Sequence, residues 1–163
     1  GAFANFVNRT FKFIEKSFSG VIPDAEISLP IQDEVTRAYQ EVGQCIEEAS
    51  FKRGLEKAFE LVRYSNKYFD EQQPWKQIKE DPERCNQTLA DCVYLIANLA
   101  LILTPFLPFS SHKVKGLLNL DEKDWRPFFV QFDHLSIVKP LFERIDPVRI
   151  AEELDRLNQQ LIK

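Results

Sequence analysis

The amino-terminal segment carries a row of polar side chains whose types suit recognition of a polar ligand. Asn5, Arg9, Lys12 and Lys16 follow one another at steps of four, three and four residues, so a helix would place them on one face. An asparagine amide both donates and accepts hydrogen bonds, and an arginine offers a rigid fork of donors. The row is either a plain solvated face or a surface that reads a ligand, and the residues alone leave both interpretations open.

A second candidate lies at Asn66–Trp75, which reads N-K-Y-F-D-E-Q-Q-P-W. Residues 70–73 form a polar stop at the end of a predicted helix. Pro74 suits the first position of a new helix, where its missing N–H is not needed, and Trp75 follows at once. Because large aromatic side chains are buried on average, Trp75 could belong to the core. Beside a helix start it could equally be an exposed platform for stacking.

The residues give no case for a catalytic or metal site. The sequence contains no G-x-x-x-x-G-K-[ST], G-x-G-x-x-G or G-x-S-x-G motif. His112 and His134 are far apart and lack clustered metal partners. An odd number of cysteines without a C-x-x-C pair argues against a disulfide framework and a zinc knuckle, and favours the reducing cytoplasm. We expect the cysteines in the core; they are Cys45, Cys85 and Cys92.

Length and composition indicate one helical domain. The chain has 163 residues, of which 44% are hydrophobic and 28% charged, which is enough for a core and argues against disorder. Phenylalanine is frequent at 14 residues and glycine is scarce at 5, a combination that favours long helices over a turn-rich β fold. The net charge of −4 gives no support to a general electrostatic grip on nucleic acid. Any contact with nucleic acid would therefore be local.

Apolar periodicity and helix-boundary residues predict an antiparallel bundle of helices. The predicted helices run from the start of the chain to about residue 18, over 31–49, from 51 to about 70, from 74 through 76–80, from 82 to about 103, from just after Ser110 or Ser111 to 118, and over 147–162. We expect small polar side chains to cap four of these helices; the predicted caps are Ser50, Asp81, Ser110 or Ser111, and Asp146.

The same periodicity assigns buried faces. The inward residues of the long apolar helix are predicted to be Leu89, Cys92, Val93, Ile96, Leu99, Ala100 and Leu103. Those of the last helix are predicted to be Val148, Ile150, Ala151, Leu154, Leu157 and Leu161. The pattern is irregular over residues 119–145, where we expect the core to be covered by Trp125, Pro127, Phe128 and Phe129.

The sequence predicts no membrane segment and no leader. The most apolar stretch, residues 93–109, is too short to span a bilayer and is interrupted by Asn98 and two prolines. We therefore expect a buried core helix there. The amino terminus lacks the basic region and apolar run of a signal peptide.

Four motifs occur in an order that is typical of one family. They are N-F-V-N-R at Asn5–Arg9, N-K-Y-F-D-E-Q-Q-P-W at Asn66–Trp75, P-F-L-P-F-S at Pro105–Ser110, and P-L-F-E-R-I-D at Pro140–Asp146. With them the chain resembles, over essentially its whole length, the C-terminal anticodon-binding helical domain of methionyl-tRNA synthetases, which are class I enzymes. The motif ending in Pro-Trp is the most specific. The resemblance implies an all-α, antiparallel helical bundle of the class I synthetase anticodon-binding type over residues 1–163. Within it, residues 136–163 would pack back toward the catalytic domain.

The resemblance also implies roles for individual residues. Asn5 and Arg9 match the family's anticodon-reading pair and Trp75 matches its stacking tryptophan, while Lys12 and Lys16 are candidates for contacts to phosphate. The implied partner is the anticodon stem-loop of tRNA(Met), with the anticodon C-A-U. One alternative is the anticodon-binding domain of another class I synthetase, against which the matched residues argue. A second alternative is a non-catalytic helical module that docks on protein.

The ligase chemistry would reside outside these residues. The parent enzyme attaches methionine to its tRNA with ATP in a Rossmann-type domain that carries H-I-G-H-like and K-M-S-K-S-like motifs, and neither motif occurs here. The resemblance therefore implies either a fragment or a stand-alone relative without the catalytic half, which is inactive alone and holds no metal or cofactor. ATP, with zinc as a further candidate, would belong to the catalytic domain of the same polypeptide. We expect Gly1-Ala2 to be a boundary within a larger, cytoplasmic protein.

Overall fold

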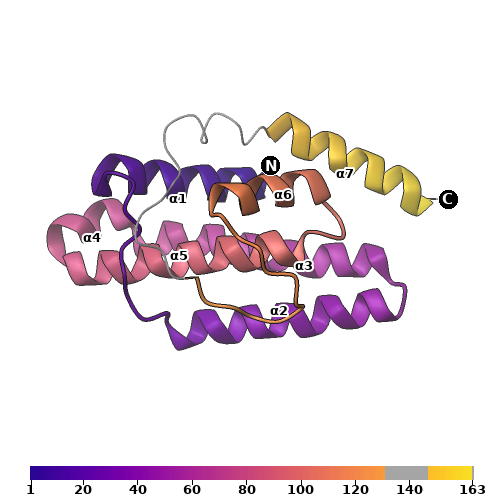
Figure 1. Cartoon of the computed structure of the whole chain (residues 1–163), viewed down its shortest axis with the longest axis horizontal. Coiled ribbons are helices and arrows are strands. Elements are labelled where there is room, and N and C mark those ends of the chain that lie inside the picture. The colour runs from indigo at the N-terminus through magenta and orange to yellow at the C-terminus, as the bar shows by residue number, and fades with distance from the viewer. Residues whose placement is uncertain (131–146, 163) are drawn as a thin grey trace.

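The computed structural model describes residues 1–130 and 147–162, and all regular structure in that part of the chain is helical. The helices are α1 (Ala2–Phe18), α2 (Leu29–Glu47), α3 (Phe51–Gln72), α4 (Pro74–Glu80), α5 (Pro82–Ile102), α6 (Pro108–Leu117) and α7 (Pro147–Ile162). Figure 1 shows α5 between α1 and α2, with α7 close to the start of α1. The all-α prediction is confirmed.

α5 is the centre of the bundle, and it packs against α1, α2, α3, α4 and α6. Every residue from Thr88 to Leu103 is buried, which includes all of those predicted to face inward. The prediction of a single buried face was nevertheless too narrow, because neighbouring helices enclose α5 and bury Asp91 and Asn98 as well. Among the described helices α5 alone is long and apolar enough to cross a membrane. However, 89% of its most apolar window is buried inside the bundle, as in the core helix of a globular domain.

Two buried polar residues of α5 fasten irregular segments to the core. Asp91 accepts hydrogen bonds from the backbone N–H of Ser28 at 2.9 Å, from the Ser28 hydroxyl at 2.6 Å and from the Tyr68 hydroxyl at 2.5 Å. Asn98 accepts from the N–H of Phe128 and donates to its carbonyl oxygen, both at 3.1 Å. Each side chain thus satisfies backbone groups that the segment cannot pair within itself.

The segment after α6 covers the core as predicted, with one exception. The Trp125 indole donates to the carbonyl oxygen of Tyr39 at 2.8 Å and lies edge-on to its ring at 5.5 Å. Gly43 makes room for this indole, because a Cβ there would lie 2.8 Å from Trp125 Nε1. Phe129 contacts the Tyr94 ring at 5.3 Å but is 61% exposed, so it shields the core less than expected. Residues 131–145 lie outside the described residues.

Prolines and polar residues set several helix ends where the sequence predicts them. Asp81 Oδ1 accepts from the N–H of Arg84 at 3.3 Å and so caps α5. Ser50 precedes α3 as expected, but its side chain forms no capping hydrogen bond. The prediction that Ser110 or Ser111 caps α6 was wrong: the helix starts at Pro108, because proline suits its first position and moves the start ahead of both serines.

α7 begins at Pro147 as predicted, but part of its inward face was assigned incorrectly. Ile150 is buried, whereas Val148 is 62% exposed and Ala151 is also exposed. Val148 lies two residues before Ile150 and therefore points to nearly the opposite side of the helix. Glu153 shares the face of Ile150: it is buried and accepts from the N–H groups of Phe109 at 3.0 Å and Ser110 at 3.3 Å and from the Ser110 hydroxyl. A pattern of apolar residues cannot anticipate a carboxylate at the centre of a helix interface. The predicted cap, Asp146, lies outside the described residues.

Candidate nucleic-acid interface

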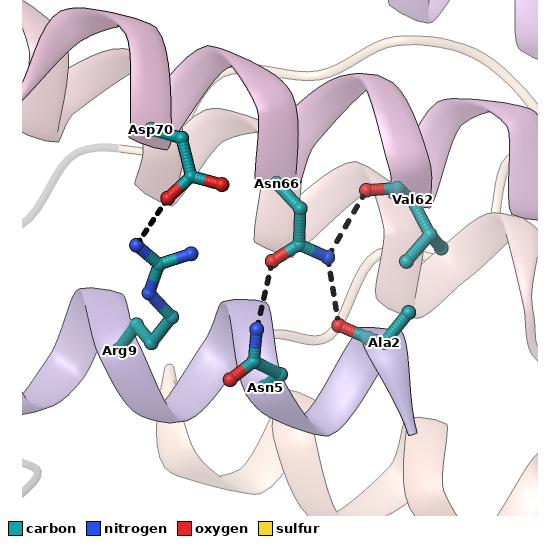
Figure 2. A network of polar contacts seen from close by, with 6 residues as sticks. All are labelled: Ala2, Asn5, Arg9, Val62, Asn66 and Asp70. Atoms are coloured by element: carbon teal, nitrogen blue, oxygen red, sulfur yellow. Dashed lines mark hydrogen bonds and ion pairs between the residues drawn. The ribbon is translucent and has the colours of Figure 1, made fainter.

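The first two residues of the polar row on α1, Asn5 and Arg9, pair with α3 in constant register. Asn5 Nδ2 donates to Asn66 Oδ1 at 3.2 Å, and Arg9 Nη2 donates to Asp70 Oδ1 at 2.5 Å. Both pairs are separated by 61 residues, so α1 and α3 run parallel and advance together by one turn from the first pair to the second (Figure 2). The parallel arrangement follows from the intervening α2, which returns the chain between them (Figure 1).

Phe69 links the two regions that the sequence singles out. The Arg9 guanidinium carbon lies 4.4 Å from the centroid of the Phe69 ring, a cation–π geometry. The Trp75 ring lies 6.1 Å from the same ring, tilted by 42°. Phe69 itself is 3% exposed, while Trp75 is 43% exposed. Arg9 and Trp75 therefore meet around one buried aromatic ring, and Trp75 is a half-covered surface residue and not a core residue.

A tight turn between α3 and α4 presents Trp75. Helix α3 continues through the polar residues 70–72, two residues beyond the predicted end, and stops at Gln73, which has a left-handed φ of 53°. Pro74 then starts α4 as expected, and its carbonyl oxygen accepts from the Cys85 thiol at 3.6 Å. The turn is thereby attached to the start of α5, which restrains the direction in which Trp75 leaves the bundle.

Arg84 secures the same turn from outside. Its Nε and Nη2 atoms donate to Gln72 Oε1 at 3.2 and 3.0 Å, and Gln77 Nε2 donates to that oxygen at 3.0 Å. One side-chain carbonyl at the end of α3 thus gathers donors from α4 and α5. Arg84 has no periodic or motif signal in the sequence, so its role emerges only from the folded structure.

The supporting residues on α3 did carry a signal that sequence reasoning used only in part. Asn66 and Asp70 are four apart, as are Asn5 and Arg9, so two matched helix faces were available for pairing. Asp70 was expected only as part of the polar stop at residues 70–73. The contacts of both α3 residues to Asn5 and Arg9 were not predicted, because single-sequence patterns do not tell which helices are neighbours.

The two lysines of the row do not take part in the polar pairs between α1 and α3. Lys12 and Lys16 are exposed and lie about one and two turns beyond Arg9 toward the end of α1. Their exposure suits contacts with a solvated, negatively charged ligand. They are not among the residues that contact α3 through the polar pairs of Figure 2.

The structure gives the thiols no catalytic environment. Cys45, Cys85 and Cys92 are buried and free, as predicted. Burial raises the pKa of Cys85 and Cys92 above the ordinary value, which keeps both as neutral thiols with little nucleophilic character. Within residues 1–130 and 147–162, no group of three or more His, Cys, Asp or Glu side chains is placed to hold a metal ion.

Comparison with known proteins identifies relatives over most of the chain. The family model described as the anticodon binding domain of methionyl tRNA ligase matches residues 20–139. A methionine–tRNA ligase from Bacillus cereus (strain 03BB102) is 48% identical over 157 residues, which cover 96% of this chain and 29% of that protein. A methionine–tRNA ligase from Bacillus anthracis (strain A0248) matches to the same extent. The chain thus spans less than a third of these relatives.

Solved structures agree on the fold. The free form of Mycobacterium tuberculosis methionyl-tRNA synthetase superimposes with a TM-score of 0.75 at 22% identity, covering 90% of this chain and 32% of that one. The matched family segment starts after α1, whereas the Bacillus relatives extend over nearly the whole chain. The motifs, the helical fold and these matches agree, and the chain belongs to the family of anticodon-binding domains of methionyl-tRNA ligases.

Proposed function

We propose that this chain is the part of a methionine–tRNA ligase that binds the anticodon of tRNA(Met) and reads C-A-U. The observation that supports it most is the meeting of Arg9 and Trp75 around Phe69, which puts a donor fork beside a half-exposed aromatic face. Anticodon bases are single-stranded, and proteins read such bases by stacking on aromatic rings and by hydrogen bonds to their Watson–Crick edges. We assign Trp75 to stack on the first base, cytosine, and Asn5 and Arg9 to read polar edges nearby.

The charges fit local recognition. With a net charge of −4, the domain would not attract RNA over its whole surface. The exposed Lys12 and Lys16 continue the polar row in the direction in which the parallel α3 runs toward the α4 turn, and there they would meet phosphates that flank the anticodon.

Aminoacylation would require the rest of the ligase. The relatives are named for that activity, but this chain covers 29% of their length and lacks the ATP motifs described above. We therefore expect no methionyl-adenylate and no methionyl-tRNA when the chain is incubated with methionine, ATP and tRNA. ATP would bind to a catalytic domain in the same cytoplasmic polypeptide, and the exposed side of α7 is our candidate for packing against that domain. Formation of methionyl-adenylate or methionyl-tRNA above background would contradict the absence of catalysis in this chain.

Substitution of Trp75 tests the proposal. Trp75→Ala removes the stacking face and should weaken binding of a C-A-U stem-loop by about 5- to 150-fold, the equivalent of roughly 1–3 kcal/mol. Titrations with C-A-U and U-A-U stem-loops, each paired with a thermal melt, give affinity, preference and stability together. Since Trp75 is 43% exposed, the melting temperature should change little.

Phe51→Ala is the matched control. Phe51 is 41% exposed and opens α3, about 30 Å from the end that carries the α4 turn at 1.5 Å per residue. Its loss should leave RNA binding unchanged. If Trp75→Ala unfolds the chain, or leaves the preference for C-A-U intact, the assignment of Trp75 to the first base fails.

A further inference from the structure

The side-chain amide of Asn66 has a single orientation that satisfies its neighbours. Its Nδ2 lies 2.9 Å from the carbonyl oxygen of Ala2 and 3.4 Å from that of Val62. Both oxygens can only accept hydrogen bonds. Turning the amide over would place Oδ1 against two oxygens and lose both hydrogen bonds, so the surroundings fix which end faces which way.

This orientation in turn sets the amide of Asn5. Asn66 Oδ1 faces Asn5 and can only accept, so Asn5 must present Nδ2, at 3.2 Å. The other end of the Asn5 amide, the Oδ1 acceptor, points away from α3 (Figure 2). Two backbone carbonyls therefore determine, through Asn66, that Asn5 offers an oxygen to whatever binds on this face.

Arg9 completes a polar pattern beside that oxygen. It lies one turn further along the same face of α1, carries donors only, and has its Nη2 end held by Asp70. The surface thus offers an acceptor from Asn5 next to donors from Arg9. Cytosine carries an amino donor beside a ring-nitrogen acceptor, whereas a uracil has a carbonyl oxygen in place of the amino group. An outward oxygen on Asn5 suits the amino group and opposes the carbonyl.

We propose that Asn66 is a positioning residue that fixes the polarity of the Asn5 amide and thereby favours cytosine over uracil at the first anticodon position. The inference rests on the proposed function, since it needs the base that stacks on Trp75 to offer its edge to Asn5. Asn66 itself touches α1 and α3 and acts through Asn5.

The decisive variant is Asn66→Leu, which keeps a similar shape and removes both polar ends. The Asn5 amide can then turn over and donate to a carbonyl. The ratio of affinities for C-A-U and U-A-U stem-loops should fall by about 5- to 10-fold, the range of one hydrogen bond. Part of the fall in this ratio should come from tighter binding of the U-A-U stem-loop. The loss of a merely structural contact would not tighten binding of either RNA.

A double-mutant cycle separates positioning from stability. In the Asn5→Ala background no amide remains to be oriented, so adding Asn66→Leu should leave the C-A-U to U-A-U ratio unchanged. If Asn66 had only a structural role, Asn66→Leu would instead lower the melting temperature and weaken the binding of both stem-loops to the same extent, with or without Asn5. An unchanged ratio on Asn66→Leu in the otherwise native chain would overturn the inference.

An RNA-free measurement keeps this outcome distinct from failure of the proposed function. NMR of the chain should show one Asn5 Nδ2 proton hydrogen-bonded and shifted from the position of an exposed amide such as Asn119, and Asn66→Leu should abolish that shift. If the native chain shows no preference for C-A-U, the proposed function fails whatever the NMR shows. If the preference is present but the Asn5 amide resembles that of Asn119, only the role of Asn66 is refuted.

Discussion

Arg9 on α1 and Asp70 on α3, which are 61 positions apart in the sequence, form an ion pair at 2.5 Å. The carboxylate holds the guanidinium where its carbon lies over Phe69. The two side chains are 29% and 60% exposed, so water screens the pair and its contribution to folding is at most about 1 kcal/mol. Its greater importance is positional, because it holds the guanidinium over Phe69, the ring that Trp75 also contacts.

Replacing Asp70 by Asn should tighten RNA binding. The change removes one negative charge next to the proposed site and leaves Arg9 its full charge toward phosphate and bases. We expect affinity for a C-A-U stem-loop to rise by a few fold at low salt, and by less at high salt because ions screen the exposed charge. Titrations at two salt concentrations measure this, with Glu47→Gln, at the opposite end of the bundle, as the control. Weaker binding by Asp70→Asn would show that the carboxylate mainly orients Arg9.

Arg9 and Lys16 should differ in how they affect recognition. Arg9→Ala should reduce both affinity and preference among anticodons, because it removes donors to a base edge. Lys16→Ala should keep the preference and lower the slope of log affinity against log salt by about 0.7, the value for one phosphate contact on a single strand. Salt-dependent titrations with C-A-U and U-A-U stem-loops distinguish these outcomes. Identical behaviour of the two variants would argue against base reading by Arg9.

Leu99→Ala should be costly for stability. Leu99 is fully buried on α5, which other helices enclose, so the substitution leaves a cavity that the surroundings cannot fill. We expect a loss of about 2–5 kcal/mol in the free energy of unfolding, measured by urea titration. Leu29→Ala is the matched control, since Leu29 is 71% exposed and should change stability little. A loss near zero at Leu99 would mean that the core of α5 is loosely packed.

Stability should decline in alkaline solution. Burial raises the pKa of Tyr94 to about 12, and burial raises those of Tyr39 and Tyr68 further. The folded chain keeps these phenol protons where the unfolded chain, with ordinary values near 10, has lost them. The stabilisation is therefore complete below about pH 10 and is lost as the pH rises toward the folded values, by at most about 1.4 kcal/mol per pH unit for each group.

Urea unfolding at several alkaline pH values, followed together with phenolate absorbance, measures this decline. Tyr39→Phe should reduce the slope, because one of the three protons no longer titrates. A free energy of unfolding that stays constant up to about pH 11.5 would contradict the raised pKa values.

Much of the fold was predictable from local residues. Proline at 74, 82, 108 and 147 opens a helix in each case, since its ring favours the first helical position and opposes later ones. The Asp81 cap was predictable for the same reason, as it depends only on neighbours in sequence. The start of α6 was predicted incorrectly from Ser110 and Ser111, because Pro108 occupies the first helical position and the helix begins before either serine can cap it.

The sequence pointed to the candidate ligand-facing residues of the proposed site, and it did not point to the residues that support them. The motifs pointed to Asn5, Arg9 and Trp75, and the structure brings Arg9 and Trp75 together around Phe69. The register of α1 on α3 comes from the packing of the whole bundle, so no local pattern could reveal that Asn66 faces Asn5. Glu153 was missed for a related reason, because a buried carboxylate depends on donors that lie on a distant helix.

The contact of Glu153 with the start of α6 has a consequence for the order in which these two helices can pack during synthesis. The first N–H groups of α6 gain no capping side chain from Leu107, and the carboxylate that Phe109 and Ser110 bind comes from a residue more than forty positions later. A ribosome makes α6 well before it makes α7, so the first amides of α6 stay hydrated until Glu153 has been made. Chains truncated between α6 and Glu153 would lack these hydrogen bonds, and the start of α6 would be less well held in them.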